Sequence, residues 1–323
     1  MKISRYGTPA AFALVGALAL SACGGQEAES GSGDSGTGTA ALSGSVASDG
    51  SSTVGPLTSA AAELFMTENT GVNITVGTSG TGGGFKKFCE GQTQISNASR
   101  PIKDEEKAAC EAKGIEYQEL VVANDALTVV ANKDNTFLKC LTVEELNTLW
   151  APEATNKVMT WDQVNPSFPA EKIQLYGPGT DSGTFDYFTD EINGEEGASR
   201  TDYEPSEDDN VIVQGVAGDK NALGYFGLTY YLENTDTLKA VEIDGGEGCV
   251  APSAETARDG SYTPLARPLF IYVDKKAFAS NPALKAFIGF YVENDAKIAE
   301  AAQYIPLSDE QKKTAQDELA ALG

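Results

Sequence analysis

The sequence predicts an α/β protein with two lobes, which a hinge of two crossing strands connects. Along the first half of the chain, predicted strands alternate with predicted helices, which is typical of a parallel sheet. Two strongly apolar stretches, residues 120–131 and 265–274, are suited to be the strands that leave and re-enter the first lobe. The chain has 323 residues, enough for two lobes of ordinary domain size.

The first 43 residues are expected to export and tether the protein. A short basic start precedes an apolar run at residues 10–20, which suits a signal peptide and is too short to span a bilayer. The run ends in Leu-Ser-Ala before Cys23, which resembles the lipid-attachment motif of lipoproteins. We therefore expect a signal peptide at residues 1–22 and a lipidated Cys23 that opens a flexible linker, residues 23–43. Ordinary secretion, with cleavage after a small residue, is the alternative.

The first predicted lobe comprises residues 44–125 together with 266–323. It should contain strands at residues 44–48 and 72–76 and a helix at 56–69 with one apolar face. Further helices are expected after the Gly-rich turn at 77–84, after Pro101, after Pro282 and after Ser308.

The second predicted lobe comprises residues 126–265. Thr142 is followed three residues later by Glu145, which is the capping-box pattern of a helix start. Two more helices should begin at residues 182–184 and 208–211. Each lobe is expected to contain its own mixed sheet.

Composition limits the possible functions. There are 47 acidic and 23 basic residues, giving a net charge of −24, so we expect no binding to nucleic acid or to anionic membrane surfaces by charge. The chain has no histidine, which removes the commonest general base and metal ligand. No metal or cofactor is expected, and an anion site would have to rely on local geometry.

Four cysteines remain after Cys23, an even number that favours disulfides in an exported protein. Three pairings are possible. We expect Cys89–Cys110 and Cys140–Cys249, because each pair then stays within one lobe. A zinc site is the alternative, but the sequence lacks both CxxC spacing and histidine.

Four polar turns precede predicted helices and share a composition of Gly, Ser and Thr: residues 49–54, 77–84, 97–101 and 177–184. Helix N-termini carry unpaired N–H groups and a partial positive charge, and glycine allows the backbone to approach a ligand closely. Hydroxyl groups add donors, so such turns can cradle an anion with little formal charge. The alternative is that these residues merely cap helices and form turns.

Taken together, the turns resemble the substrate-binding proteins of phosphate-specific ABC importers, the PstS-type family, over residues 42–307. The motifs DGSST, TSGTGGG, ASRPI and DSGTFDYF occur in the order typical of that family, and Tyr304-Ile305-Pro306-Leu307 also matches it. The resemblance implies a type II periplasmic-binding-protein-like fold. It also implies inorganic phosphate held between the lobes and a membrane permease as partner.

The resemblance suggests phosphate contacts in all four turns. The predicted site residues are Ser51, Ser52, Thr53, Ser79, Thr81, Ser99, Arg100, Asp181, Ser182, Gly183 and Thr184.

Two positions depart from the family pattern. Arg100 stands where many members have aspartate, and Pro178 stands where many have arginine. We expect Arg100 to supply the guanidinium; the alternative is that it only pairs with a nearby carboxylate. The carboxylate that would accept the phosphate proton is then missing, and Asp181 and Asp125 are candidate replacements. Lys86 and Lys87 are interpreted as solvated surface charges.

The predicted function is therefore an extracytoplasmic lipoprotein, monomeric and attached to the cell membrane through Cys23, that binds phosphate for an importer. Binding of another oxyanion, such as sulfate or molybdate, is the first alternative. A phosphatase-like enzyme is disfavoured because there is no histidine to activate a serine and no GxSxG motif. A surface adhesin would leave the four polar turns unexplained.

Overall fold

The computed structural model describes residues 42–180 and 182–323. Its strands are β1 (Ser43–Gly50), β2 (Gly71–Val76), β3 (Ile95–Ala98), β4 (Tyr117–Asn132), β5 (Cys140–Thr142), β6 (Gln174–Gly177), β7 (Glu204–Pro205), β8 (Ala222–Gly227), β9 (Leu238–Ala240), β10 (Glu242–Asp244), β11 (Cys249–Val250) and β12 (Ala266–Asp274).

The longer helices of the described residues are α1 (Val54–Glu68), α2 (Thr81–Cys89), α3 (Asp104–Ala112), α4 (Val143–Trp150), α6 (Gly183–Asn193), α7 (Asp209–Gly218), α11 (Pro282–Glu293) and α13 (Asp309–Ala321). The shorter helices are η1 (Pro152–Ala154), α5 (Trp161–Val164), α8 (Leu228–Glu233), α9 (Ala254–Arg258), α10 (Lys275–Ser280) and α12 (Asp295–Ala301). Among the described residues, no helix combines the length and the apolar character needed to cross a membrane.

The fold class is confirmed as α/β with a mixed sheet. Strand order in the main sheet is β2-β1-β3-β12-β4-β8-β6-β7, with β9 also paired to β4. The pairs β1–β2, β1–β3, β8–β6 and β6–β7 are parallel, whereas β12 and β4 run antiparallel to their neighbours. A second sheet of the described residues has the order β11-β10-β5.

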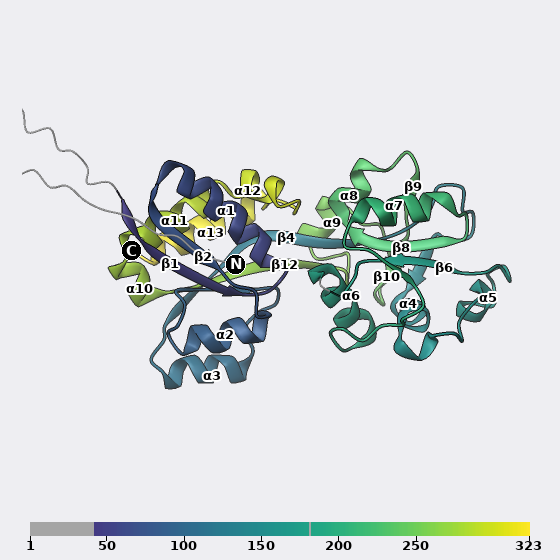
Figure 1. Ribbon diagram of the computed structural model, residues 1–323, viewed down its shortest axis with the longest axis horizontal. Coiled ribbons are helices and arrows are strands. Elements are labelled where there is room, and N and C mark those ends of the chain that lie inside the picture. Colours follow the sequence, from purple (N-terminus) through teal and green to yellow (C-terminus); the bar gives the residue numbers. More distant parts are fainter. Residues whose placement is uncertain (1–41, 181) are drawn as a thin grey trace, which may run out of the picture. The chain divides into compact units, whose positions relative to one another are not determined.

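The main sheet is continuous because β4 is long. Its first part pairs with β12 and its second part with β8 and β9 (Figure 1). The two sets of strands that the sequence predicts, one for each lobe, are both present. They share β4, a strand of 16 residues that is buried throughout its second half and joins the two sets by hydrogen bonds.

The β4–β12 pair contains a bulge. Ala123 is opposite Leu269 and Val121 is opposite Phe270, so Val122 is an extra residue on β4. Val122 and Ala123 consequently both lie in the same hydrophobic cluster, although neighbouring strand residues normally point to opposite faces.

Two large clusters of buried apolar side chains cover the sheet. The first, here called core A, draws on residues 46–123 and 269–315. The second, core B, draws on residues 127–265. Residues 41–323 form one compact unit, and the predicted lobe boundaries stay a prediction.

Local capping signals located the helix starts well. Thr142 accepts a hydrogen bond from the Glu145 amide at 3.1 Å, and the Glu145 carboxylate accepts one from the Thr142 amide at 2.8 Å. The same reciprocal arrangement joins Ser308 and Gln311 at the start of α13. These are the capping boxes that the sequence predicts.

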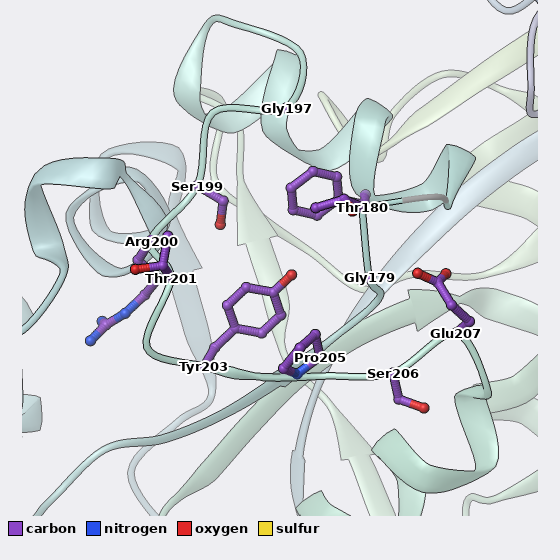
Figure 2. Close-up of a pocket in the computed structure, with 11 residues that line it drawn as sticks. Gly179, Thr180, Gly197, Ser199, Arg200, Thr201, Tyr203, Pro205, Ser206 and Glu207 are labelled. Atoms are coloured by element: carbon purple, nitrogen blue, oxygen red, sulfur yellow. The ribbon is translucent and has the colours of Figure 1, made fainter.

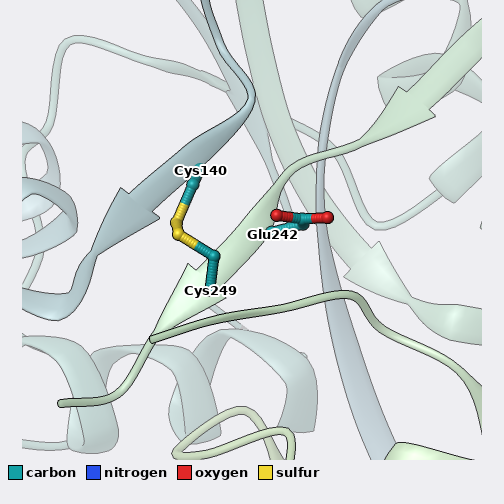
Figure 3. A group of neighbouring side chains, drawn as sticks. All are labelled: Cys140, Glu242 and Cys249. Carbon is teal, nitrogen blue, oxygen red and sulfur yellow. A yellow bond between two sulfur atoms is a disulfide. The ribbon is translucent and has the colours of Figure 1, made fainter. Parts of the chain in front are cut away.

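Both predicted disulfides are present. Cys89–Cys110 joins α2 to α3, and Cys140–Cys249 joins β5 to β11. Glu242 lies beside the second bond, with the three ligand-type atoms within 4.8 Å of one another (Figure 3). The two sulfur atoms are bonded to each other and so are not available as thiolate ligands for zinc.

Candidate anion-binding site

Three of the four polar turns follow the carboxyl ends of neighbouring parallel strands, β1, β2 and β3. The amide of Gly50 donates to the carbonyl of Gly77 at 3.2 Å, and the amide of Ser51 donates to the carbonyl of Asn97 at 2.9 Å. A Cβ atom on Gly84 would lie 2.5 Å from the Gly50 Cα, so only glycine lets α2 approach β1 this closely. The turns 49–54, 77–84 and 97–101 therefore meet at one edge of the sheet.

The first turn starts α1 with a buried serine. Ser51 is only 2% exposed, and its Oγ accepts hydrogen bonds from the amides of Thr53 at 3.2 Å and Val54 at 3.3 Å. This is the capping role that the sequence analysis gives as the alternative. Ser52, in contrast, is half-buried and directs its hydroxyl toward Asp186 of α6, 3.3 Å away.

In the second turn, Asp49 organises the backbone. Its Oδ1 accepts hydrogen bonds from the Ser79 amide at 3.1 Å and the Ser79 hydroxyl at 2.5 Å. Its Oδ2 pairs with the Lys87 ammonium at 2.5 Å. Although burial raises it, these bonds hold the pKa of Asp49 below its ordinary value. The Lys87 side chain is 40% exposed, in line with the interpretation as a solvated charge on the helix surface, but it also forms an ion pair that the sequence analysis missed, because β1 places a carboxylate within its reach.

The second and third turns are linked by hydroxyl groups. Thr81 Oγ1 lies 3.1 Å from Ser99 Oγ and accepts a hydrogen bond from the Ser99 amide at 3.3 Å. Thr81 is the first residue of α2, so both hydroxyls lie at a helix N-terminus.

Arg100 forms a fork with Glu106 of α3. Nη1 and Nη2 donate to the two carboxylate oxygens, each at 2.8 Å, and Nη1 also donates to the Pro101 carbonyl at 3.1 Å. The hydrogen bonds to Glu106 raise the pKa of Arg100. Pairing with a carboxylate is the alternative that the sequence leaves open, and a contact between Arg100 and a ligand stays a prediction.

The fourth turn meets the first. Ser182 caps α6 by accepting a hydrogen bond from the Thr184 amide at 3.2 Å. Thr53 Oγ1 lies 3.4 Å from the Gly183 carbonyl. A Cβ atom on Gly183 would stand 2.8 Å from Thr53 Oγ1 and 3.0 Å from its backbone nitrogen. The N-termini of α1 and α6 are thus in direct contact, as an anion site between four turns requires.

Asp181 and Cys23 lie outside the described residues. Of the other predicted site residues, Ser52, Thr53, Gly183 and their neighbours Ser182 and Thr184 lie together, and Thr81 lies with Ser99. Ser79 is exposed and engaged by Asp49. Pro178 accepts a hydrogen bond from the Tyr203 hydroxyl at 2.8 Å.

Sequence reasoning missed Arg267 and Asp186. Arg267 lies on β12 directly opposite Asp125 of β4, with its Nε 3.5 Å from the Asp125 carboxylate. Its Nη2 donates to Thr53 Oγ1 at 3.1 Å, and its guanidinium carbon lies 3.4 Å from the ring centre of Tyr187. The available signal was an arginine and an aspartate within two apolar strands, because buried charges are normally paired.

Two carboxyl groups, those of Asp125 and Asp186, lie close enough to this arginine for its charge to act on their pKa values. Burial raises the pKa of Asp125, against the opposing influence of Arg267. Burial also raises the pKa of Asp186, while the Ser52 hydroxyl and Arg267 act in the other direction. Asp125, one of the two candidate proton acceptors, is therefore held close to the guanidinium, and Asp186 adds a carboxyl that the sequence analysis did not consider.

Two cavities border the site. One, of about 220 Å³, is lined by residues that include Asp125, Thr184 and Tyr304. The other, of about 430 Å³, lies beside Gly179 and Thr180, with the Tyr203 hydroxyl pointing toward this loop (Figure 2).

Comparison with known proteins matches this architecture. Residues 35–295 match the PBP superfamily domain. The chain is 42% identical to the phosphate-binding protein PstS of Staphylococcus saprophyticus over 308 residues, covering 95% of this chain and 90% of the relative. The chain belongs to the PstS-type family. The chain is also 51% identical to protein SphX of Synechocystis sp. over 266 residues, covering 82% of this chain and 79% of SphX.

Solved structures of similar proteins agree with the PstS-type assignment. A possible phosphate-binding protein from Planctomyces limnophilus has a TM-score of 0.83 and 47% identity, covering 87% of this chain and 99% of that one. A putative phosphate ABC transporter substrate-binding protein from Clostridium perfringens, with bound phosphate, has a TM-score of 0.55 and 27% identity. The match covers 82% of this chain and 100% of that one.

Proposed function

We propose that this PstS-type protein is an extracytoplasmic lipoprotein that binds inorganic phosphate and delivers it to an ABC-type importer. The observation that carries the proposal is the direct contact between the N-termini of α1 and α6, beside the α2 turn. The names of the relatives add support, since those reported above as PstS are phosphate-binding proteins.

The proposed site holds the anion mainly by neutral donors. The first N–H groups of a helix have no partner within the helix and are therefore free to bind an anion, and here α1, α2 and α6 supply such groups. Further donors are the hydroxyls of Ser52, Thr53, Thr81, Ser99 and Thr184. Arg100 contributes from the rim through the part of its guanidinium that Glu106 leaves available. The binding is non-covalent, and no catalytic role is proposed.

Attachment and partners follow from the N-terminal segment and the family. Cys23 carries the lipid, residues 23–43 act as tether, and a membrane permease receives the phosphate. The protein works as a monomer at the outer face of the cell membrane.

Calorimetry on the purified mature protein tests the ligand. Phosphate, sulfate and molybdate are titrated separately at pH 7. We expect one tight phosphate site and little heat with sulfate. A carboxylate such as that of buried Asp125 or half-buried Asp186 can accept a hydrogen bond from the proton of hydrogen phosphate, and sulfate has no such proton. A preference for sulfate or molybdate would assign the protein to another oxyanion, and hydrolysis of a phosphate ester would indicate an enzyme.

Metabolic labelling with a palmitate analogue tests the anchor. Labelled wild-type protein in the membrane fraction, and unlabelled, released Cys23→Ala protein, would support lipid attachment at Cys23. An equal distribution of both proteins would contradict it.

A further inference from the structure

We infer that Arg267 is a direct ligand of the bound oxyanion, and that Tyr187 and Asp125 hold its guanidinium in place. The inference deepens the proposed function and rests on it. None of the four polar turns contains Arg267, which lies in the strand β12 that runs beside β4 from core A to core B.

The guanidinium is held by three different elements. Thr53, at the start of α1, accepts its Nη2–H at 3.1 Å, and Asp125 of β4 lies 3.5 Å from its Nε. The ring of Tyr187 from α6 lies under its plane at 3.4 Å, a contact that combines stacking with cation–π attraction. Tyr187 is itself fixed, because its hydroxyl donates to the Pro264 carbonyl at 2.7 Å.

Most of the hydrogen-bonding capacity of Arg267 is unused. An arginine has five N–H donors. Among the described residues the guanidinium makes one hydrogen bond, to Thr53, and its buried Nε makes none. The side chain is 16% exposed, so water reaches it poorly. Arg100, in contrast, uses three donor contacts on Glu106 and Pro101.

The electrostatic setting also favours an anion at this point. The N-termini of α1 and α6 each carry a partial positive charge of roughly half a unit, and Arg267 adds a full charge beside them. These positive groups repel one another. Asp125 balances them incompletely, because burial raises its pKa and the ion pair is long. A bound oxyanion would remove the repulsion and satisfy the remaining donors.

The test uses Arg267→Gln and the double variant Asp125→Asn/Arg267→Gln, which leaves no unpaired charge in the strand pair. Arg258→Gln is the matched control, because it removes the same charge from a side chain of α9 that donates to the Pro306 carbonyl. Phosphate affinity is measured by calorimetry, and folding by circular dichroism and thermal unfolding. We expect about 100-fold weaker binding for the double variant, from the loss of one or two charged hydrogen bonds, and less than twofold change for Arg258→Gln.

Chemical rescue separates a ligand from a structural residue. In Arg267→Ala the ring of Tyr187 is left uncovered, and free guanidinium ion at about 20 mM should restore phosphate affinity at least tenfold, relative to equal sodium chloride, by cation–π binding to that ring. A folded double variant that binds phosphate within threefold of wild type, or an absence of rescue, would overturn the inference and leave the proposed function intact. A wild-type protein that binds no phosphate would instead overturn the proposed function.

Discussion

Gly183→Ala should weaken phosphate binding without disturbing the fold. The new Cβ atom would stand 2.8 Å from Thr53 Oγ1, 3.0 Å from the Thr53 nitrogen and 3.2 Å from Ser52 Oγ. Ordinary contacts of a Cβ atom begin at about 3.4 Å, so the N-termini of α1 and α6 must separate by roughly half an ångström. The two hydrogen bonds between them, at 3.3 and 3.4 Å, are already long and would be lost.

The expected loss of phosphate affinity follows from the number of hydrogen-bond donors that the separation moves out of line with the anion. Losing alignment of one or two donors to a charged ligand costs about 2 to 3 kcal/mol, which corresponds to roughly 30- to 150-fold weaker binding. The fold itself should tolerate the change, because Gly183 is the first residue of α6 and alanine is a better helix former than glycine.

Calorimetry with phosphate, together with thermal unfolding, measures both quantities. Gly289→Ala is the control, since it lies inside α11 with nothing within 4 Å of its new Cβ atom. It should raise stability by up to about 1 kcal/mol and leave affinity unchanged. If Gly183→Ala bound phosphate within twofold of wild type, the contact between the two helix starts would have no part in binding.

The remaining predictions concern single groups. Arg100→Ala should weaken phosphate binding at least tenfold in the same titration, and an unchanged affinity would place Arg100 outside the site. Replacing the two cysteines of one disulfide by serine should lower the free energy of unfolding by about 3 kcal/mol for Cys89–Cys110 and by about 5 kcal/mol for Cys140–Cys249, because the second bond closes the longer loop. Urea titrations that showed equal losses for the two double variants would contradict this prediction. Burial, and then the neighbouring Asp208 and Glu207, raise the pKa of Asp209 to about 6. The stabilising contribution of Asp209 is therefore complete below about pH 4 and is lost as the pH rises through 6. Relative to wild type, the free energy of unfolding of Asp209→Asn should rise by roughly 1 to 2 kcal/mol between these pH values. Parallel plots of unfolding free energy against pH for the two proteins would refute the raised pKa. Phosphate affinity should change little between 50 and 500 mM salt, since the donors are mostly neutral dipoles, and a steep loss would indicate a site built on formal charge.

Local signals account for what the sequence predicted well. Thr142 with Glu145 and Ser308 with Gln311 are pairs three residues apart, so the geometry of one helical turn determines their contacts. Ser182 caps α6 for the same reason. Such features depend on few neighbours, and the residue types alone indicate them.

The missed features depend on how distant segments are paired. Arg267 reaches Thr53 across 214 positions, and it does so because β12 and β4 pair in a register that no local pattern reports. Lys87 meets Asp49 only because α2 folds back on β1. For Arg100 the sequence allows two interpretations, a ligand contact or a carboxylate partner, and Glu106 on α3 is such a partner only six residues away.

The extra residue in β4, Val122, changes which positions of the strand face the hydrophobic clusters. Upstream of Val122, the even-numbered Leu120 belongs to core A, whereas downstream the odd-numbered Leu127 and Val129 belong to core B. Asp125 shares this odd parity. Because Val122 has no partner of its own on β12, the change of phase occurs without a change of pairing, and a chain that lacked Val122 would still place Asp125 opposite Arg267. The bulge is therefore a position at which β4 can gain or lose one residue while the polar pair that faces the site is kept.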